Sequence, residues 1–273
     1  IAEPSVTYGD APFHLSVSGG SGTGSLSYAV ASGNAVTVNA ITGVTTVVKA
    51  GSATVTVTKA ADSNYHPKSA SVTITVGKAI PAAVFPTAAS LTYGQSLSNS
   101  VLTGGSGDGS FAWENPDTIP AVINSGFTVV FTPSDIENYV TMERTVGLVV
   151  NKAAQTPLRV TGIPDNLTFG DAPFHITVDG GSGTGTLSYA VISGKAVAVD
   201  AAGKVTITHA GAAAIKVTNP GDDNYLPASH TLSLTVNKAA QQAALTFALP
   251  ESIAYGDTPF QISGSGGSGS GAF

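Results

Sequence analysis

One internal repeat constrains this chain more than any other feature. Residues 5–39 recur at an offset of 161, with 24 of 35 positions identical. The opening sequence Tyr-Gly-Asp-Ala-Pro-Phe-His at residues 8–14 returns at 169–175 with Phe first, and in altered form at 93–95 and 255–261. A fixed period of this kind indicates a series of similar modules.

Each repeat continues with a Gly/Ser loop, then an acidic-Asn-Tyr loop, and closes with a strand and a Lys-Ala pair. These features predict four domains: repeat 1, residues 1–79; repeat 2, a shorter variant, residues 80–153; repeat 3, closely similar to repeat 1, residues 154–239; and an incomplete repeat 4, residues 240–273. Repeat 2 lacks 11 residues between Trp113 and Phe127 when it is compared with repeat 1. We expect about one strand and its turn to be missing there.

The composition excludes several classes of protein. The 273 residues include no Cys, which excludes disulfides and thiolate metal sites. Only 10% of the residues are charged and 42% are hydrophobic, as in a chain that folds around a core. The formal net charge of −6 provides no basic surface for a polyphosphate, so we expect no nucleic-acid partner. No apolar run approaches the ~18 residues of a membrane span. The chain shows no leader peptide and does not begin with Met, so we expect a segment of a longer polypeptide.

Alternating apolar and polar residues predict the strands. In residues 53–58 Ala and Val alternate with Thr, and repeat 3 has Ala213, Ile215 and Val217 at the matching places, with Lys216 on the polar side. The closing strands, and one strand of repeat 2, alternate in the same way: Val72, Ile74, Val76; Val146, Leu148, Val150; Leu232, Leu234, Val236; and Phe127, Val129, Phe131. In repeat 1 the full set of predicted strands lies near residues 5–8, 12–18, 25–31, 35–39, 44–49, 53–59 and 69–77.

Seven short strands separated by turns, without a helical stripe, predict an all-β fold. Each amphipathic sheet needs a second sheet over its apolar face, so every repeat should be an immunoglobulin-like antiparallel β-sandwich. The aromatic residues Tyr28, Trp113 and Tyr189 fall on the third strand, where such sandwiches place a buried ring. Because the linkers are short and contain Pro, we expect the tandem sandwiches to lie end to end as a semi-rigid rod.

These residues resemble a known family, the bacterial immunoglobulin-like (Big-type) tandem repeats of surface and secreted proteins, related to those of invasin and intimin. In repeat 1 the resemblance lies in residues 28–30, 35–38, 42–44, 50–57 and 71–76, and repeat 3 matches nearly as well. Repeat 2 is similar to repeats of Gram-positive surface proteins through residues 111–113, 131–135 and 138–139. The resemblance implies an extracellular location, at the bacterial cell surface or secreted, and a spacer role.

Two features that look like catalytic motifs have a simpler interpretation. The Gly/Ser loop at residues 19–24 is similar to a phosphate-binding loop, but that device needs a following helix, and here a strand follows. His14 and His175 are repeat-equivalent, and a catalytic residue duplicated in each copy is not expected. His66, His209 and His230 are isolated, and no Ser lies in a nucleophile motif. We therefore assign no catalytic, cofactor-binding or metal-binding residue and expect no enzyme activity.

The acidic-Asn-Tyr loops, residues 62–65, 135–139 and 222–225, are the best candidate sites, with two interpretations. Asp and Asn can cap their own backbone in a tight turn while the Tyr packs on the end of the domain, as in a tyrosine corner. Alternatively, the carboxylates join an aspartate of a neighbouring repeat to bind Ca²⁺ between domains; the candidates are Asp10, Asp171 and Asp257. Gln95 replaces this aspartate in repeat 2, which favours the turn.

Two hypotheses for the function follow. In the first, the chain is a structural stalk of a large bacterial surface or secreted protein, such as an adhesin, that projects a functional domain and has neighbouring repeats as partners. In the second, connecting loops such as residues 115–120 bind a glycan or a host protein. Trp113, the single Trp, is a possible carbohydrate platform, but its alignment with Tyr28 and Tyr189 favours burial.

The incomplete repeat 4 supplies at most two strands in residues 251–273, too few to bury a core. We expect this part to be disordered, to dock on repeat 3, or to pair with another molecule by strand addition.

Overall fold

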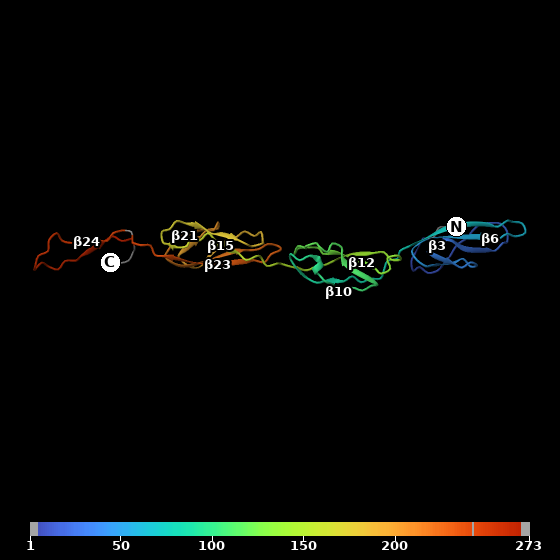
Figure 1. Ribbon diagram of the computed structural model, residues 1–273, viewed down its shortest axis with the longest axis horizontal. Helices are drawn as coiled ribbons and strands as arrows, with labels where there is room; N and C mark the ends of the chain where they lie inside the picture. Colours follow the sequence, from blue (N-terminus) through green and yellow to red (C-terminus); the bar gives the residue numbers. More distant parts are fainter. Residues whose placement is uncertain (1–4, 242, 269–273) are drawn as a thin grey trace. The chain divides into compact units, whose positions relative to one another are not determined.

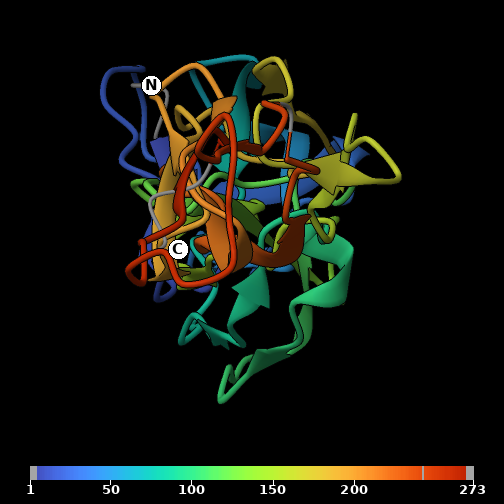
Figure 2. The same ribbon diagram turned by 90° about the vertical axis from the view of Figure 1, so that its left-hand side faces the viewer.

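The structure is a computed structural model that describes residues 5–241 and 243–268. Its regular structure is almost entirely β-strand, and the one helix among the described residues is the short 3-10 helix η1, Leu97–Asn99. Figures 1 and 2 accordingly show strands and loops in all parts of the chain. The chain divides into two compact units, Ile1–Asn151 and Lys152–Phe273.

Repeat 1 forms two sheets around one core. Its strands are β1 (Ser5–Thr7), β2 (Phe13–His14), β3 (Leu26–Gly33), β4 (Val36–Val38), β5 (Val44–Val47), β6 (Gly51–Lys59) and β7 (Lys68–Gly77). One sheet has the order β1-β7-β6-β3 and the other the order β2-β5-β4. Tyr28, Val36, Val55 and Ile74 from both sheets meet in the core, which confirms the predicted inner faces.

The other face of β6 carries a row of hydroxyl groups. Thr56 pairs with Ser71 and Thr58 with Ser69 through side-chain hydrogen bonds of 2.8 Å across the antiparallel β6–β7 ladder. Cross-strand hydroxyl pairs of this kind stabilise an exposed sheet face without charge. The alternation of Val and Thr therefore separates a buried face from a polar one.

Repeat 2 also has seven strands, but a different arrangement. They are β8 (Thr87–Ala88), β9 (Leu91–Thr92), β10 (Leu102–Thr103), β11 (Gly109–Trp113), β12 (Phe127–Pro133), β13 (Met142–Val146) and β14 (Val150–Asn151). Three hydrogen-bonded groups result: β11-β12-β13, β10-β8 and β14-β9. The core includes Leu97, Trp113 and Val129.

The prediction that repeat 2 lacks about one strand is wrong. Repeat 1 has two strands, β4 and β5, between β3 and β6, whereas no strand lies between β11 and β12. Residues 114–126 are too few for two strands and their turns, so they form a loop that hydrogen-bonds η1 instead. Leu97 N–H donates to Thr118 O at 2.9 Å and Ser98 N–H donates to Pro116 O at 2.8 Å. The buried Leu97 and Pro120 then close the core where the two strands are missing.

Repeat 3, in the second unit, reproduces the sandwich of repeat 1 and adds two strands. Its strands are β15 (Arg159–Thr161), β16 (Leu167–Thr168), β17 (Phe174–His175), β18 (Thr177–Asp179), β19 (Ser188–Gly194), β20 (Val197–Val199), β21 (Lys204–Ile207), β22 (Gly211–Asn219) and β23 (Ala228–Asn237). The sheets are β16-β23-β22-β19, β17-β21-β20 and the pair β15-β18. Lys216 is exposed between the buried Ile215 and Val217, as predicted.

The strand pair β15–β18 explains why repeat 3 has a strand directly after β17 where repeat 1 has none directly after β2. We predicted a strand over residues 12–18, but in repeat 1 the strand β2 ends at His14. In repeat 3 the corresponding segment continues as β18 because β15 lies beside it, with Val160 opposite Val178. Residues 16–18 have no such partner strand among the described residues of repeat 1.

Within each sandwich the last strand runs parallel to a strand near the start of the repeat, although the other strand pairs are antiparallel. β1 pairs with β7, β9 with β14 and β16 with β23. The antiparallel sandwich expected from the sequence therefore contains one parallel pair in each repeat.

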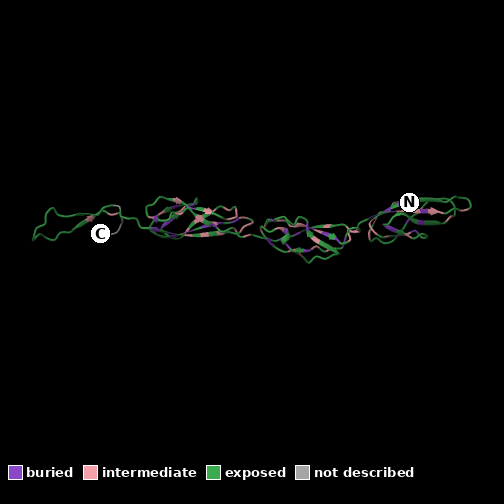
Figure 3. Ribbon diagram, in the orientation of Figure 1, coloured by how far each residue is buried: buried purple, intermediate pink, exposed green. Residues whose placement is uncertain are grey.

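The described part of repeat 4 is a single hairpin, β24 (Thr246–Ala248) paired with β25 (Ser263–Ser265). The prediction of at most two strands in residues 251–273 extends beyond the described residues at 269–273. Figure 3 shows buried positions inside repeats 1, 2 and 3, but only exposed or intermediate ones in residues 243–268. Three separate hydrophobic clusters thus serve the three complete repeats. The exact boundaries 1–79, 80–153, 154–239 and 240–273 remain a prediction.

Candidate functional site

The carboxylate of Asp62 holds the acidic-Asn-Tyr loop of repeat 1. Its Oδ1 accepts hydrogen bonds from the backbone N–H groups of Asn64 at 2.8 Å and Tyr65 at 2.9 Å. Its Oδ2 accepts from the N–H of Thr23 at 2.6 Å, which fixes the Gly/Ser loop to the same carboxylate. In repeat 3 Asp222 makes the same bonds to Asn224, Tyr225 and Thr184.

These hydrogen bonds favour the ionised form of both carboxyl groups. The backbone N–H of Asn64, followed by that of Thr23, lowers the pKa of Asp62 below its usual 3.8. The N–H of Thr184, followed by that of Asn224, lowers the pKa of Asp222 in the same way. A carboxylate stabilised as an anion by several donors does not exchange protons near neutral pH. The geometry therefore agrees with the interpretation in which Asp62 and Asp222 cap the backbone of their own tight turns.

The Lys-Ala pairs do more than close their repeats. Ala79 N–H donates to Asn138 O at 2.8 Å, and Val140 N–H donates to Ala79 O at 3.0 Å, so that Ala79 forms a parallel bridge to Tyr139 in the next repeat. Lys78 Nζ donates to Ile136 O at 2.6 Å. Lys152 and Ala153 make the equivalent bonds to the loop of repeat 3, with Asp222, Asn224 and Leu226.

Sequence reasoning missed this connection because the two partners are far apart in the chain. The available signal was the recurrence of Lys-Ala in every repeat, at a position where packing of a strand does not require it. Each acidic-Asn-Tyr loop in repeats 2 and 3 is thus a docking point for the linker that precedes its own repeat.

Further contacts join repeats 1 and 2 inside the first unit. Asn138 Oδ1 accepts from the N–H of Ala50 at 2.8 Å, and Lys49 Nζ lies 3.0 Å from Glu137 Oε1. The rings of Tyr8 and Tyr139 meet edge to face with centroids 5.4 Å apart. Tyr139 therefore packs on the preceding repeat, whereas a tyrosine corner packs on its own domain. The tyrosine-corner interpretation is wrong for this residue.

The aspartates of the proposed Ca²⁺ site have local hydrogen-bond partners. Asp10 Oδ2 accepts from Thr7 N–H, Asp171 Oδ2 from Thr168 N–H, and Asp257 Oδ2 from Ala254 N–H, at 2.6–2.7 Å. Gln95 Oε1 makes the same bond to Thr92 N–H in repeat 2, so the position serves a turn and does not require charge. No group of three or more His, Cys, Asp or Glu side chains in the described part of the chain has a metal-binding arrangement.

The Gly/Ser loops lead into strands, as predicted. The loop of repeat 1 is followed by β3, so no helix N-terminus faces it. Gly22 has φ +84°, and a Cβ there would collide with the carboxylate of Asp62. Glycine is required because the loop crosses a side chain closely, which is a structural and not a catalytic reason.

Trp113 is buried, as its alignment with Tyr28 predicted. Its Nε1–H donates to Ser100 O at 3.0 Å, and its ring belongs to the core of repeat 2. A buried indole offers no platform for a sugar. The loop of residues 115–120 borders a cavity of about 230 Å³ lined by Leu97, Asn115 and Thr118.

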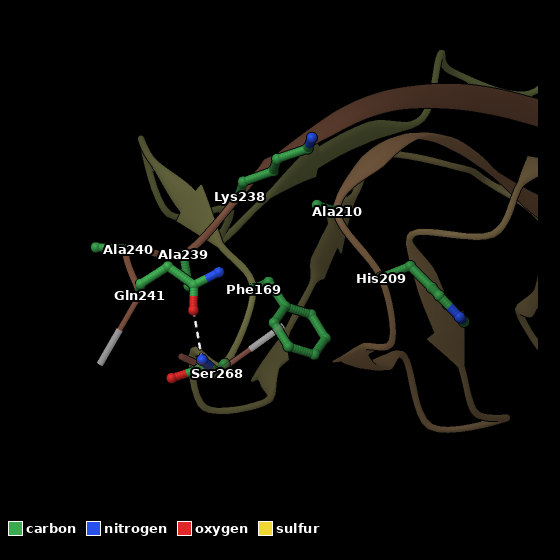
Figure 4. Close-up of a pocket in the computed structure, with 9 residues that line it drawn as sticks. Phe169, His209, Ala210, Lys238, Ala239, Ala240, Gln241 and Ser268 are labelled. Atoms are coloured by element: carbon green, nitrogen blue, oxygen red, sulfur yellow. Dashed lines mark hydrogen bonds between the residues drawn. The ribbon is translucent and has the colours of Figure 1, made fainter. Parts of the chain in front are cut away.

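A larger cavity, of about 560 Å³, lies where repeat 3 ends (Figure 4). Its lining includes Phe169, His209, Ala210, Lys238 and Ala239. The first three correspond to Tyr8, Lys49 and Ala50 of repeat 1, which contact the acidic-Asn-Tyr loop of repeat 2. The cavity at the end of repeat 3 therefore corresponds to the position that the acidic-Asn-Tyr loop of repeat 2 occupies at the end of repeat 1.

Comparison with known proteins identifies no family. No known family model and no curated protein matches the sequence. Among solved structures, Drosophila N-cadherin EC1-4 is similar at 12% identity and a TM-score of 0.38, covering 87% of this chain and 72% of that one. Human CDH23 EC21-23 is similar at 14% identity and a TM-score of 0.34, covering 85% of this chain and 96% of that one. Sidekick-1 immunoglobulin domains 1-5 is similar at 12% identity and a TM-score of 0.31, covering 90% of this chain and 60% of that one.

At these scores the similarity carries no argument about function. The strands, their pairing and the paired sheets define the class: an all-β chain of tandem immunoglobulin-like β-sandwiches. No helix in residues 5–241 or 243–268 has the length and apolar character to cross a bilayer.

Proposed function

We propose that this chain is a structural stalk or spacer of a large bacterial cell-surface or secreted protein, such as an adhesin, and that it performs no catalysis. The observation that carries the proposal is the bonded junction of repeats 1 and 2. The backbone bridge at Ala79, the Lys78 hydrogen bond and the Tyr8–Tyr139 contact restrict the bending of this linker. Restricted linkers suit a part that holds another domain at a distance.

The same contacts support the expected semi-rigid, end-to-end arrangement for repeats 1 and 2. Small-angle X-ray scattering of the whole chain tests it through the distribution of interatomic distances. Four Gly/Ser residues inserted between Ala79 and Ile80 should broaden that distribution towards bent forms. The same insertion after Gly105, in an exposed loop of repeat 2, is the matched control and should leave it unchanged. A chain that is already compact and flexible without the insertion would contradict the stalk role.

A second candidate function is a binding module for a glycan or a host protein. The observation in its favour is the cavity of about 230 Å³ beside residues 115–120, where the shortened repeat 2 differs most from the others. Saturable binding on a glycan array or to host cells, lost on Asn115→Ala with Thr118→Ala, would support it. Ile119→Ala is the control in the same loop, because its side chain is exposed and lies outside the cavity lining.

A further inference from the structure

The three-stranded sheet of repeat 2 forms one wall of the cavity of about 230 Å³. Thr128 of β12 lies directly opposite Thr145 of β13, and the N–H of Glu114 donates to Thr128 O at 3.0 Å. These three residues form a row across the end of the sheet. Their neighbours Trp113 and Val129 are buried, so the alternation of the strands places the row on the face away from the core.

The loop of residues 114–126 forms a second wall, because Asn115, Thr118 and Ser125 also line the cavity. In repeat 1 the strands β4 and β5 occupy this stretch of the chain, so the cavity belongs to the segment in which repeat 2 differs. Thr118 O accepts from Leu97 N–H at 2.9 Å, and Gly126 N–H donates to the side chain of the same loop at Asn124 Oδ1, at 3.0 Å. A wall that is held in place before a ligand arrives reduces the entropy lost on binding.

The polar side chains of the cavity are available to a ligand. Within residues 5–241 and 243–268 they have no hydrogen-bond or ion-pair partner. All are exposed except Thr128, which is half-buried. Their hydroxyl and amide groups can both donate and accept hydrogen bonds. The set consists of Glu114, Asn115, Thr118, Ser125, Thr128 and Thr145.

The cavity also has an apolar part. Leu97 is buried, and Phe127 is half-buried and packs against the core of repeat 2. Both line the cavity, so an aromatic ring stands beside the hydroxyl and amide groups. A wholly apolar ligand would cover these polar groups without pairing them, which is unfavourable. The lining therefore suits a ligand that has an apolar face and several hydroxyl groups.

The charge of the lining restricts the ligand further. Of the described residues that line the cavity, Glu114 alone is charged. A carboxylate only accepts hydrogen bonds, and it repels a second anion. The ligand must therefore donate hydrogen bonds at this place, and phosphate, sulfate and acidic sugars are disfavoured.

We propose that this cavity binds a single neutral sugar ring at the end of a glycan. Hydroxyl groups of the sugar donate to Glu114 and exchange hydrogen bonds with Asn115 and Thr118, while its apolar C–H face contacts Phe127. The cavity is smaller than the roughly 300 Å³ at which sites for drug-sized ligands begin, so it holds one ring and the rest of the glycan stays in solvent. The proposal rests on the second candidate function, in which repeat 2 is a binding module, and names its ligand class.

Titration of the whole chain with free sugars, followed by ¹H–¹⁵N NMR, tests the ligand class. The probes are the methyl glycosides of glucose, galactose and mannose, with glucuronic acid and sialic acid as acidic counterparts. At least one neutral glycoside should bind saturably with a Kd of about 1 mM, a weak affinity suited to one small ring. The affected amides should lie in residues 114–128 and in η1. The acidic sugars should cause no shift at these amides.

Glu114→Gln tests the role of the carboxylate. It should weaken binding of the neutral sugar by about tenfold, because a charge-assisted hydrogen bond is lost, and it should allow glucuronic acid to bind. Glu143→Gln is the matched control, since Glu143 is exposed on β13 but lies outside the cavity lining. Equal effects of the two substitutions would overturn the assignment of Glu114.

Filling the cavity tests its position. Ser125→Leu should abolish sugar binding, whereas Ala121→Leu, which enlarges an exposed residue of the same loop outside the lining, should not. The proposal is overturned if no neutral sugar binds, if acidic sugars bind equally well, or if Ser125→Leu still binds. If host-cell binding persists in that case and is lost on Asn115→Ala with Thr118→Ala, the binding module stands and only the sugar site is wrong. If the chain binds neither sugars nor cells, both are wrong.

Discussion

Lys78 Nζ donates a hydrogen bond of 2.6 Å to the carbonyl oxygen of Ile136, a residue 58 positions further along the chain. Lys78→Met should lower the stability of the first unit by about 1 kcal/mol, because an exposed hydrogen bond contributes about that much. Urea unfolding followed by the fluorescence of Trp113 measures it. Lys68→Met, at an exposed position of β7, is the control, and an equal loss there would contradict a specific role for Lys78.

The core of repeat 2 depends on Trp113. Trp113→Ala should lower its unfolding free energy by about 3–5 kcal/mol, since it leaves a large cavity between the sheets. Trp113→Phe should cost less, but leaves Ser100 O without its donor. Differential scanning calorimetry of the chain should show one transition shifted and the others in place. Ile119→Ala, at a 57% exposed side chain, should change nothing. A glycan-binding defect with unchanged stability would contradict the structural role of Trp113.

Gly43 is required for two separable reasons. Its φ is +69°, and a Cβ would lie 2.6 Å from Cζ of Tyr28. Gly9 has φ +90° and open space around its Cβ position. Gly9→Ala should therefore cost only the backbone strain, about 1–2 kcal/mol, whereas Gly43→Ala should cost about 1–3 kcal/mol more through displacement of the Tyr28 ring. Thermal unfolding followed by circular dichroism measures both. Equal losses would show that the Tyr28 contact does not matter.

The anchoring aspartates predict how stability depends on pH. Because hydrogen bonds to the anion lower the pKa of Asp62 and Asp222 in the folded state, each stabilises the fold at pH values above 3.8, the usual pKa. That stabilisation is lost as the pH falls below 3.8 and through the lower folded pKa. Asp62→Asn combined with Asp222→Asn should flatten the decrease of melting temperature between pH 5 and 2, a window about the usual value. An unchanged slope in the double variant would rule out these two groups as its source.

The sequence predicted which face of a strand is buried better than it predicted which distant segments contact each other. Alternation at residues 53–58 depends only on neighbouring positions, so the buried Val55 and the less buried Thr residues of β6 were predicted correctly. The third-strand aromatic was recognised for the same reason. By contrast, the bridge between Ala79 and Tyr139 joins segments that no local pattern connects. The number of strands missing between β11 and β12 was underestimated. A difference in length does not show that the remaining residues form a loop bonded to η1 and not a strand.

The parallel pairing of the first and last strands of repeat 1 determines how this repeat responds to tension. When the chain is pulled from both ends, Ser5 and Gly77 are drawn in opposite directions along β1 and β7. The force then acts along the strands and shears their hydrogen bonds together, whereas a hairpin pulled at its open end unzips one bond at a time. The hydrogen bonds between β1 and β7 therefore resist the force at both ends of repeat 1.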